Sequence, residues 1–563
     1  MLSAVMSAAV LGVDAYEITV EVDCALGLPQ WTIVGLPAGA VKESRERVGA
    51  ALVNSGFTVP PRRVTVNLAP ADVRKEGSAF DLPIALGILV ATRQLEPGAL
   101  AGITVVGELG LEGAVRPVRG ALPIARLVAR KGGALVLPAA NVAEASLVRG
   151  VSLVAPATLA ELVAQLRAGS LVAAAAPQPA PVVPASPDFA DVVGQTYAKR
   201  ALEIAAAGEH GVLLVGPPGA GKTMLARCLP SVLPPLTEEE ALEVIAVHSV
   251  AGLLAAAPSI GLARPFRAPH HSISAAGLVG GGSVPRPGEV SLAHHGVLFL
   301  DEMLEFPRSV LEVLRQPIED GRVVLSRAAT SVTFPARFSL VGATNPCPCG
   351  HAGPGARQPC TCTAADIARY RARLSGPLSD RIDLHVHVGA MPLQALGAPA
   401  GGEPSAAIRA RIEVARLRQR HRYRALGGVG SNARVPGRWL DTQSAVAPDA
   451  RAMLVRAAER LRLSARGYHR VLRVARTIAD LDGAEGIEAS HVAEALRYRP
   501  IAEGHATAPV ADGLRAHAPP ARAGAAGVER AQASVPDGAS PRAAATPAAA
   551  TASPPPAVPC STP

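Results

Sequence analysis

The sequence VLLVGPPGAGKT at residues 212–223 decides which kind of domain lies at the centre of the chain. Four apolar residues, 212–215, predict a buried parallel strand, and a glycine-rich loop leads from it into a helical pattern. Backbone N–H groups of such a loop surround a phosphate, a lysine reaches the β- and γ-phosphates, and a hydroxyl binds Mg²⁺. The order of strand, loop and helix therefore predicts a site for ATP and Mg²⁺ in an α/β domain, formed by Gly216, Pro217, Pro218, Gly219, Ala220, Gly221, Lys222 and Thr223.

Two further apolar runs end in polar residues that suit the same site. Residues 297–300 precede Asp301 and Glu302. We expect Asp301 to hold Mg²⁺ and Glu302 to polarise the attacking water. Residues 338–342 lead to Asn345, which is expected to lie between the other two strands and to orient that water. Each signal has an ordinary alternative, a helix N-cap for the acidic pair and an Asn-Pro turn for Asn345.

The rest of the chain divides by composition and periodicity. Short β-branched runs alternate with helical patterns before the central domain, and long arginine-rich helical patterns without strand runs follow it. An Ala/Pro-rich stretch typical of a linker separates the first two parts, and an Ala/Pro/Ser/Thr-rich tail, expected to be disordered, ends the chain. The predicted boundaries are residues 1–167 for the first domain, 168–187 for the linker, 188–402 for the ATPase core, 403–503 for a helical lid and 504–563 for the tail.

Composition narrows the class of protein. Of the 563 residues, 49% are apolar, yet no stretch of about 18 residues is free of charged, polar or proline breaks, so we expect no membrane segment. No basic region precedes the first apolar residues, which argues against a signal peptide and for the cytoplasm. The net charge of +9, carried mostly by arginine, suits an anionic partner such as nucleic acid, although genome base composition explains it equally well.

Three strands that end in these residues resemble those of AAA+ ATPases. The segment SGPLSDRID, residues 375–383, is similar to the arginine-finger region of the Mg-chelatase and MCM-like branch, which implies that Arg381 reaches the ATP of a neighbouring subunit. Residues 464–468, SARGY, are similar to a sensor-2 motif and imply that Arg466 contacts the γ-phosphate in the same ring, with Arg470 and Arg473 as substitutes. The alternative for either arginine is a surface ion pair.

Further motifs resemble the Mg-chelatase-like family known as the ComM or YifB type. They are RAPHHS at 267–272, GGG at 280–282, PGE at 287–289, HHG at 294–296 and NPCPCG at 345–350. The resemblance spans residues 1 to about 500 and implies a homo-oligomeric ring, a hexamer, that drives branch migration of DNA during natural transformation. The alternatives are the motor subunit of a metal chelatase, or a noncatalytic scaffold, which an intact Lys222, Asp301 and Glu302 argue against.

The first domain resembles the fold of Lon-type proteases, through KEGSAFDLP at 75–83, GEL at 107–109 and VRPV at 115–118. In those peptidases a lysine activates a serine. Ser78 aligns with that nucleophile, but Leu122 stands where the lysine belongs. We therefore expect a catalytically silent domain, in which Ser78 belongs to a loop that caps the following helix.

Four of the seven cysteines, Cys347, Cys349, Cys360 and Cys362, occur within sixteen residues. A Gly/Pro-containing loop between the two C-x-C pairs is able to fold them onto one tetrahedral site, for which Zn²⁺ is the natural ion, with His351 as a substitute ligand. The alternative is a group of reduced thiols.

Two segments are candidates for contact with DNA. Residues 321–334 predict a hairpin that lines the pore in related rings, with Arg327 near its tip, and the glycine-rich segment around Arg286 is a second pore-loop candidate. A denser basic helix follows, which is either a DNA-binding face or a solvated charged face; its arginines are Arg409, Arg411, Arg416, Arg418, Arg420, Arg422 and Arg424.

Overall fold

The computed structural model describes residues 2–59, 61–71, 75, 77–175, 186–254, 263–282, 285–327, 330–353, 358–390, 402–427 and 429–499. The tail predicted at 504–563 lies outside these residues, as does half of the predicted linker, residues 176–185. None of the helices among the described residues is long and apolar enough to cross a membrane.

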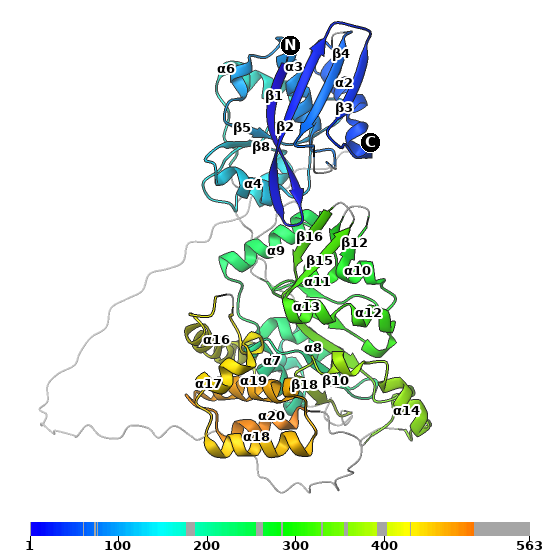
Figure 1. Cartoon of the computed structure of the whole chain (residues 1–563), viewed down its shortest axis with the longest axis vertical. Coiled ribbons are helices and arrows are strands. Elements are labelled where there is room, and N and C mark those ends of the chain that lie inside the picture. Colours follow the sequence, from blue (N-terminus) through cyan, green and yellow to red (C-terminus); the bar gives the residue numbers. More distant parts are fainter. Residues whose placement is uncertain are drawn as a thin grey trace, which may run out of the picture. The chain divides into compact units, whose positions relative to one another are not determined.

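The first domain is a seven-stranded mixed sheet in the order β3-β4-β2-β1-β5-β8-β9 (Figure 1). Alternate residues of β2 are buried because one face of the sheet packs on α3, whose residues are all buried. The strands are β1 (Leu2–Leu11), β2 (Asp14–Ala25), β3 (Gln30–Val34), β4 (Arg63–Ala69), β5 (Ile103–Val105), β8 (Ala134–Val136) and β9 (Ser152–Val154), with the short pair β6 (Glu108–Leu109) and β7 (Val115–Arg116). The helices are α1 (Gly39–Lys42), α2 (Ser44–Asn54), α3 (Asp81–Ala91), α4 (Ala121–Ala129), α5 (Val142–Ala145) and α6 (Leu159–Ala168).

The central domain is a five-stranded parallel sheet in the order β11-β14-β17-β10-β18. The runs of apolar residues in its strands follow from burial on both faces. The strands are β10 (Val212–Val215), β11 (Phe266–Arg267), β14 (Val297–Leu300), β17 (Ser339–Thr344) and β18 (Leu384–His387). Around them lie α7 (Thr196–Gly208), α8 (Lys222–Val232), α9 (Glu238–Ala251), α10 (Ala275–Val279), α11 (Glu289–Leu292), α12 (Arg308–Glu312), α13 (Arg315–Asp320), α14 (Ala364–Arg371) and α15 (Gly376–Ser379).

Two antiparallel ribbons extend from this domain. One pairs β12 (Gly280–Gly281) with β13 (Arg286–Pro287), and the other pairs β15 (Arg322–Arg327) with β16 (Thr330–Pro335). The second ribbon is the hairpin that the sequence predicts.

The described part of the C-terminal module contains helices and no strands. These helices are α16 (Ser405–Arg422), α17 (Gly437–Gln443), α18 (Pro448–Arg460), α19 (Ala465–Asp482) and α20 (Ala489–Arg497). Buried residues of α16 and α19, such as Ile412 and Leu472, share one hydrophobic core with α7 and β10. The fold class is thus confirmed: an α/β domain, a P-loop core on a parallel sheet, and a helical module.

The two edges of the parallel sheet organise the polar residues of the core. Because the strands run in one direction, the loops that follow β10, β14 and β17 lie at the carboxyl edge, and the loops that precede β10, β14, β17 and β18 lie at the amino edge. Four-residue strands separate the two edges by about 13 Å. The polar chemistry of the two edges is therefore independent within one chain.

Candidate nucleotide-binding site

The phosphate-loop lysine lies at the carboxyl edge, where α8 begins. Lys222 Nζ donates hydrogen bonds to the carbonyls of Gly216 (2.7 Å) and Pro217 (3.0 Å) and to Asn345 Oδ1 (3.1 Å). Burial lowers the pKa of Lys222. Gly221, just before the helix, has a φ of +86°, which favours glycine. A partly buried ammonium group that contacts only neutral oxygens is suited to exchange them for phosphate oxygens.

Two oxygen ligands for a divalent cation meet beside this lysine. Thr223 Oγ1 donates to Asp301 Oδ2 at 2.8 Å, although the residues are 78 positions apart. A hydroxyl and a carboxylate are hard oxygen donors, the ligand type that Mg²⁺ prefers together with phosphate and water. The residues present therefore fit Mg²⁺.

Glu302 has a different environment from Asp301. Its side chain is 58% exposed, and its backbone adopts a φ of +49°, a region that non-glycine residues occupy at a cost. His271 Nδ1 lies 3.7 Å from Glu302 Oε2, and the His271 ring contacts that of His270 in a tilted arrangement with 4.0 Å between centroids. No role for His271 is predicted from the sequence. Its motif was visible, but only the pairing of β11 with β14 brings it to the acidic strand.

The two arginines predicted to contact phosphate share one carboxylate away from the phosphate loop. Arg381, which is 8% exposed, lies before β18 at the amino edge, and its Nη2 is 2.9 Å from Glu319 Oε1. Arg466 Nη2 is 3.4 Å from the same Glu319 oxygen. Since the amino edge is about 13 Å from the carboxyl edge, neither arginine is placed to reach the phosphate loop of its own chain.

The substitute arginines have structural partners. Arg470 is buried and donates through Nη1 to the carbonyl of Arg381 (2.6 Å) and to Asp383 Oδ1 (2.5 Å). Arg473 Nε donates to the carbonyl of Val435 at 2.9 Å. Arg470 thus fixes the backbone of Arg381, which makes it a positioning residue for that arginine.

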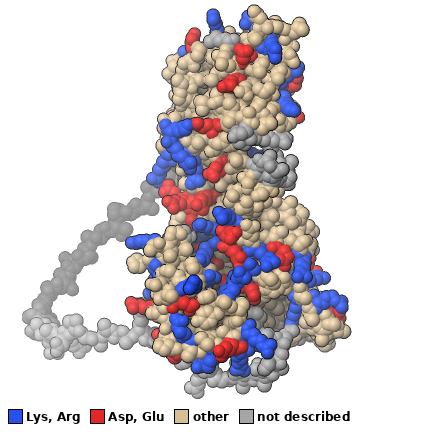
Figure 2. Space-filling view, viewed as in Figure 1, with Lys and Arg blue, Asp and Glu red and all other residues tan. Residues whose placement is uncertain are grey.

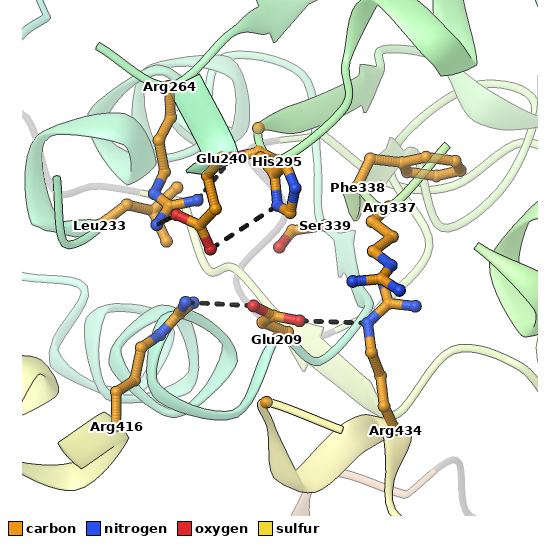
Figure 3. Close-up of a pocket in the computed structure, with 12 residues that line it drawn as sticks. Glu209, Leu233, Glu240, Arg264, His295, Arg337, Phe338, Ser339, Arg416 and Arg434 are labelled. Carbon is orange, nitrogen blue, oxygen red and sulfur yellow. Dashed lines mark hydrogen bonds and ion pairs between the residues drawn. The ribbon is translucent and has the colours of Figure 1, made fainter. Parts of the chain in front are cut away.

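A cavity lined by charged side chains lies at the amino edge, between the sheet and the helical module. Figure 3 shows its carboxylates between arginines: Glu209 pairs with Arg416 (3.1 Å) and Arg434 (3.2 Å), and Glu240 pairs with Arg264 (3.1 Å). The cavity measures about 80 Å³. Both carboxylates of the cavity are paired with arginines, which indicates a structural ion-pair cluster, and Arg337 lines the cavity as a further cation.

The protein itself uses part of the arginine-rich helix. Five of its seven arginines bind groups of the chain, but Arg411, Arg418, Arg420 and Arg424 are exposed. A DNA-binding face and a solvated charged face therefore both stay predictions for this helix. Arg409 donates to the carbonyl of Ser231, Arg411 pairs with Glu203 and Glu403, Arg416 binds the Ala206 carbonyl and Glu209, Arg418 binds the Asp480 carbonyl, and Arg422 pairs with the Asp480 carboxylate. Figure 2 accordingly shows Lys and Arg mixed with Asp and Glu over the viewed face of the core and helical module.

A second group of metal-ligating residue types, Glu243, His294 and His295, has the geometry of a hydrogen-bonded clamp. Glu243 Oε2 lies 3.0 Å from His294 Nε2 and 2.8 Å from His295 Nε2. The Arg337 N–H donates to His294 Nδ1 at 3.0 Å, which assigns the ring proton to Nε2. Burial lowers the pKa of His294 to about 4, so the neutral ring donates to Glu243 and offers that nitrogen to no cation.

The predicted DNA-contacting segments lie beside each other. A Cβ at Gly280 in β12 would lie 3.3 Å from Leu325 in β15, so the two ribbons are neighbours. Arg286 in β13 is exposed. Arg327 is the last residue of β15, and the hairpin tip, residues 328–329, lies outside the described residues. DNA contact by Arg286 and Arg327 stays a prediction.

The first domain has no serine–lysine pair at the predicted positions. Ser78 donates a short hydrogen bond to Glu108 Oε2. Leu122, where the lysine would be needed, is fully buried against Ile245 and Ala246 of α9 in the ATPase core. In this chain the position anchors one domain to the other, within the compact unit of residues 1–502.

The comparisons with known proteins agree with this architecture. Profiles described as "Magnesium chelatase, subunit ChlI", "Subunit ChlI of Mg-chelatase" and "Magnesium chelatase, subunit ChlI C-terminal" match residues 188–396, 20–141 and 402–499. The chain is 43% identical to the protein YifB of Salmonella typhimurium, over 89% of this chain and 97% of YifB. It is also 43% identical to the competence protein ComM of Haemophilus influenzae, over 88% and 97% of the two chains. The magnesium-chelatase 38 kDa subunit of Cereibacter sphaeroides is 28% identical, over 28% of this chain and 52% of that subunit.

Proposed function

The chain belongs to the YifB/ComM family of magnesium-chelatase-like AAA+ proteins, and from this premise we propose that it is an ATP-hydrolysing ring motor that acts on DNA. The observation that carries the proposal is the convergence of Lys222, Thr223, Asp301 and Asn345, from three strands, at the carboxyl edge of one sheet. Convergence of residues so far apart in sequence has no evident structural need, and it provides the groups that phosphoryl transfer requires.

Each residue then has a defined task in hydrolysis. Gly216 to Gly221 and Lys222 bind the phosphates, and Thr223 with Asp301 holds Mg²⁺, which neutralises charge on the β- and γ-phosphates. Asn345 orients a water molecule and Glu302, exposed beside it, polarises that water. Arg381 and Arg466 act on the ATP of the adjacent subunit, because the amino edge is about 13 Å from the carboxyl edge that carries the phosphate loop of their own chain.

Because the phosphate loop and the arginines lie at opposite edges of each subunit, the site requires a closed homo-oligomer, and we propose a hexamer. Each subunit presents its phosphate loop at one edge of the sheet and its arginines at the other, so identical subunits complete each other's sites head to tail. Hydrolysis then depends on ring assembly, since an arginine supplied in trans accelerates phosphoryl transfer by about 10³- to 10⁵-fold.

DNA is the substrate that we propose for this motor, and branch migration in natural transformation, in the cytoplasm, is the process. The support is the positive net charge, the exposed Arg286 beside the β15–β16 hairpin, and similarity over most of both chains to a protein named for competence. Similarity to the chelatase subunit covers far less of this chain, which makes a chelatase motor the second candidate. We further propose Zn²⁺ as the ion of the cysteine cluster.

The test is ATP-dependent branch migration of a labelled three-strand or Holliday junction by the purified protein. The wild type is expected to resolve the junction, and Lys222→Ala, which lacks the phosphate-binding amine, is expected to leave it intact. A matched control is Lys199→Ala, because Lys199 Nζ binds the carbonyls of Phe189 and Val192 away from the phosphate loop. If the wild type hydrolyses ATP while junction DNA is unchanged and has no effect on the rate, the DNA motor is excluded and the chelatase motor is favoured.

A further inference from the structure

The four clustered cysteines form a site with tetrahedral dimensions. Cys347 Sγ lies 3.3 Å from Cys349 Sγ and 3.7 Å from Cys360 Sγ, the last two sulfurs are 3.5 Å apart, and all four ligand atoms lie within 4.8 Å of one another. Four thiolates at the Zn–S distance of about 2.3 Å are separated by about 3.8 Å. Disulfide sulfurs are bonded at about 2.05 Å, so these spacings match a shared ion and exclude a bonded pair.

Backbone N–H groups lie around the sulfurs of the first cysteine pair. The Ala352 N–H points at Cys347 Sγ, with 3.2 Å between nitrogen and sulfur. The N–H groups of His351 and Thr361 contact Cys349. Hydrogen bonds to the ligand atoms of a structural metal site hold those atoms in place. The cluster therefore has the ligand set, the spacing and the surrounding donors of a structural zinc site, and the geometry assigns no ligand role to His351.

This cysteine loop lies directly against the phosphate loop. A Cβ at Gly350 would lie 2.7 Å from Pro218 Cδ and 4.0 Å from Asn345 Cγ, so the bare glycine backbone packs on both. The Gly350 N–H donates to the carbonyl of Cys347 at 3.0 Å, which ties it to the first cysteine. Gly350 also has a φ of +84°, a conformation that a bound pair of flanking cysteines would maintain.

The far end of the same loop returns to the nucleotide site. Tyr370 Oη in α14 lies 3.4 Å from Thr344 Oγ1, and Arg371 Nε donates to the carbonyl of Pro346 at 3.4 Å. Thr344 and Pro346 flank Asn345 in the sequence. The cysteine cluster thus closes a loop that begins and ends beside the residue that binds Lys222.

We infer that the four cysteines bind one zinc ion, and that this ion holds Gly350 against Pro218, so that ATP affinity depends on metal occupancy. The second half of the inference rests on the proposed ATP-binding function. On metal binding the four thiols release their protons to solvent, and four coordinate bonds replace weak contacts between neutral groups. Without the ion the two C-x-C pairs lose their connection, and Gly350 is free to leave the proline that shapes the phosphate loop.

The first measurement is metal content of the full chain, purified under reducing conditions, by plasma mass spectrometry. One zinc per chain is expected for the wild type and for Cys24→Ala, a control in β2 of the first domain, and none for the double variant Cys360→Ser/Cys362→Ser. Anaerobic titration of Co²⁺ into metal-stripped wild type is expected to give the absorption bands of a tetrahedral tetrathiolate. A wild type that holds neither zinc nor cobalt would overturn the metal site.

The second measurement is the dissociation constant of a fluorescent ATP analogue, compared for two glycine variants in the same loop. Gly350→Ala places a methyl group against Pro218, whereas Gly353→Ala also puts alanine at a positive φ, +115°, but with nothing within 4 Å. Both are expected to retain zinc. Gly350→Ala and the double cysteine variant are expected to weaken ATP binding about three- to thirty-fold, the usual range for coupling between neighbouring sites, and Gly353→Ala to leave it unchanged.

The possible failures are distinguishable. If the zinc-free cysteine variant binds ATP like the wild type, or if both glycine variants weaken binding equally, the contact with the phosphate loop has no effect and the coupling is wrong. If the zinc-loaded wild type binds no ATP, the proposed ATPase function and the coupling with it are wrong, while the metal content still establishes the zinc site.

Discussion

The carboxyl and amino edges of the parallel sheet in the ATPase core carry opposite kinds of polar chemistry. At the carboxyl edge Lys222 contacts only neutral oxygens, and Asp301 accepts from the Thr223 hydroxyl. At the amino edge Asp383 pairs with Arg470 (2.5 Å) and His210 (2.9 Å), and Glu209 pairs with Arg416 and Arg434. At the carboxyl edge, the groups proposed to bind a ligand have only weak hydrogen-bond partners. At the amino edge, the charged groups that hold domains together are paired with opposite charges of the same chain.

Arg381 lies at the amino edge, but its proposed function is at the carboxyl edge of a neighbouring subunit. Substitution of Arg381 is therefore expected to have the largest effect. Arg381→Ala is expected to lower kcat for ATP hydrolysis about 10³- to 10⁵-fold, the usual contribution of an arginine supplied in trans. An equimolar mixture with Glu302→Gln is expected to recover part of the rate, because each variant supplies the residue that the other lacks. If steady-state assays show no recovery in mixed rings whose subunits exchange, Arg381 acts within its own subunit or only as a structural residue.

Glu302 gives the next largest effect. Glu302→Gln removes the carboxylate that polarises water, and we expect ATP hydrolysis to fall about 10²- to 10⁴-fold with ATP binding retained. Glu305→Gln is the matched control, since Glu305 is a half-exposed carboxylate three residues later that pairs with Arg373 at 2.9 Å. Equal losses of ATP hydrolysis in the two variants would show that the rate depends on negative charge near this strand end and not on the Glu302 carboxylate in particular.

At the amino edge the expected effect is on stability. Asp383 is 6% exposed, and Asp383→Ala leaves the Arg470 guanidinium and His210 without their carboxylate, which is expected to cost about 3–5 kcal/mol of unfolding free energy in urea. Asp301→Ala at the carboxyl edge is expected to change stability by less than about 1 kcal/mol while it abolishes hydrolysis. A large loss of unfolding free energy for Asp301→Ala would contradict the view that the carboxyl edge serves catalysis and the amino edge serves stability.

The same carboxylate predicts a pH dependence of stability. Burial raises the pKa of Asp383, but the charge of Arg470 and the hydrogen bond from His210 outweigh it, so the pKa in the folded protein lies below 3.8, its ordinary value. A lowered pKa contributes stability that is present above the unfolded pKa and is lost as pH falls through the folded one. We therefore expect unfolding free energy to fall below about pH 4, by at most about 1.4 kcal/mol per pH unit for this group. Urea titrations at pH 5, 4 and 3 measure it, and the slope should be shallower in Asp383→Asn.

The smallest effect is expected for Glu319, which links Arg381 and Arg466 but is 37% exposed. Glu319→Gln should change the unfolding free energy by less than about 1 kcal/mol, because solvent screens ion pairs at such a surface. Thermal unfolding checks this. A larger loss would mean that Arg381 and Arg466 stabilise their own chain through Glu319 and are not available to the ATP of a neighbouring subunit.

Residues with strong local patterns could be predicted from the sequence, and residues defined by long-range pairing could not. Val212 to Val215 and the glycine-rich loop after it predict strand, loop and helix start, since burial on both faces and phosphate binding each demand a local residue pattern. The hairpin of β15 and β16 and the helical module were predicted for the same reason. His271 was missed, because its proximity to Glu302 depends on β11 lying next to β14.

The sequence by itself determined the class of the protein: a phosphate loop, an acidic strand end and a paired-cysteine motif are short patterns whose chemistry is fixed by residue type and spacing. Only the tertiary structure decided which charges are used within the chain. It places Arg381 and Arg466 on one carboxylate at the amino edge, pairs three of the seven arginines of the arginine-rich helix with carboxylates and brings Gly350 onto Pro218. The physical reason is that an ion pair or a packing contact depends on the distance between two side chains, and sheet order sets that distance for residues remote in sequence.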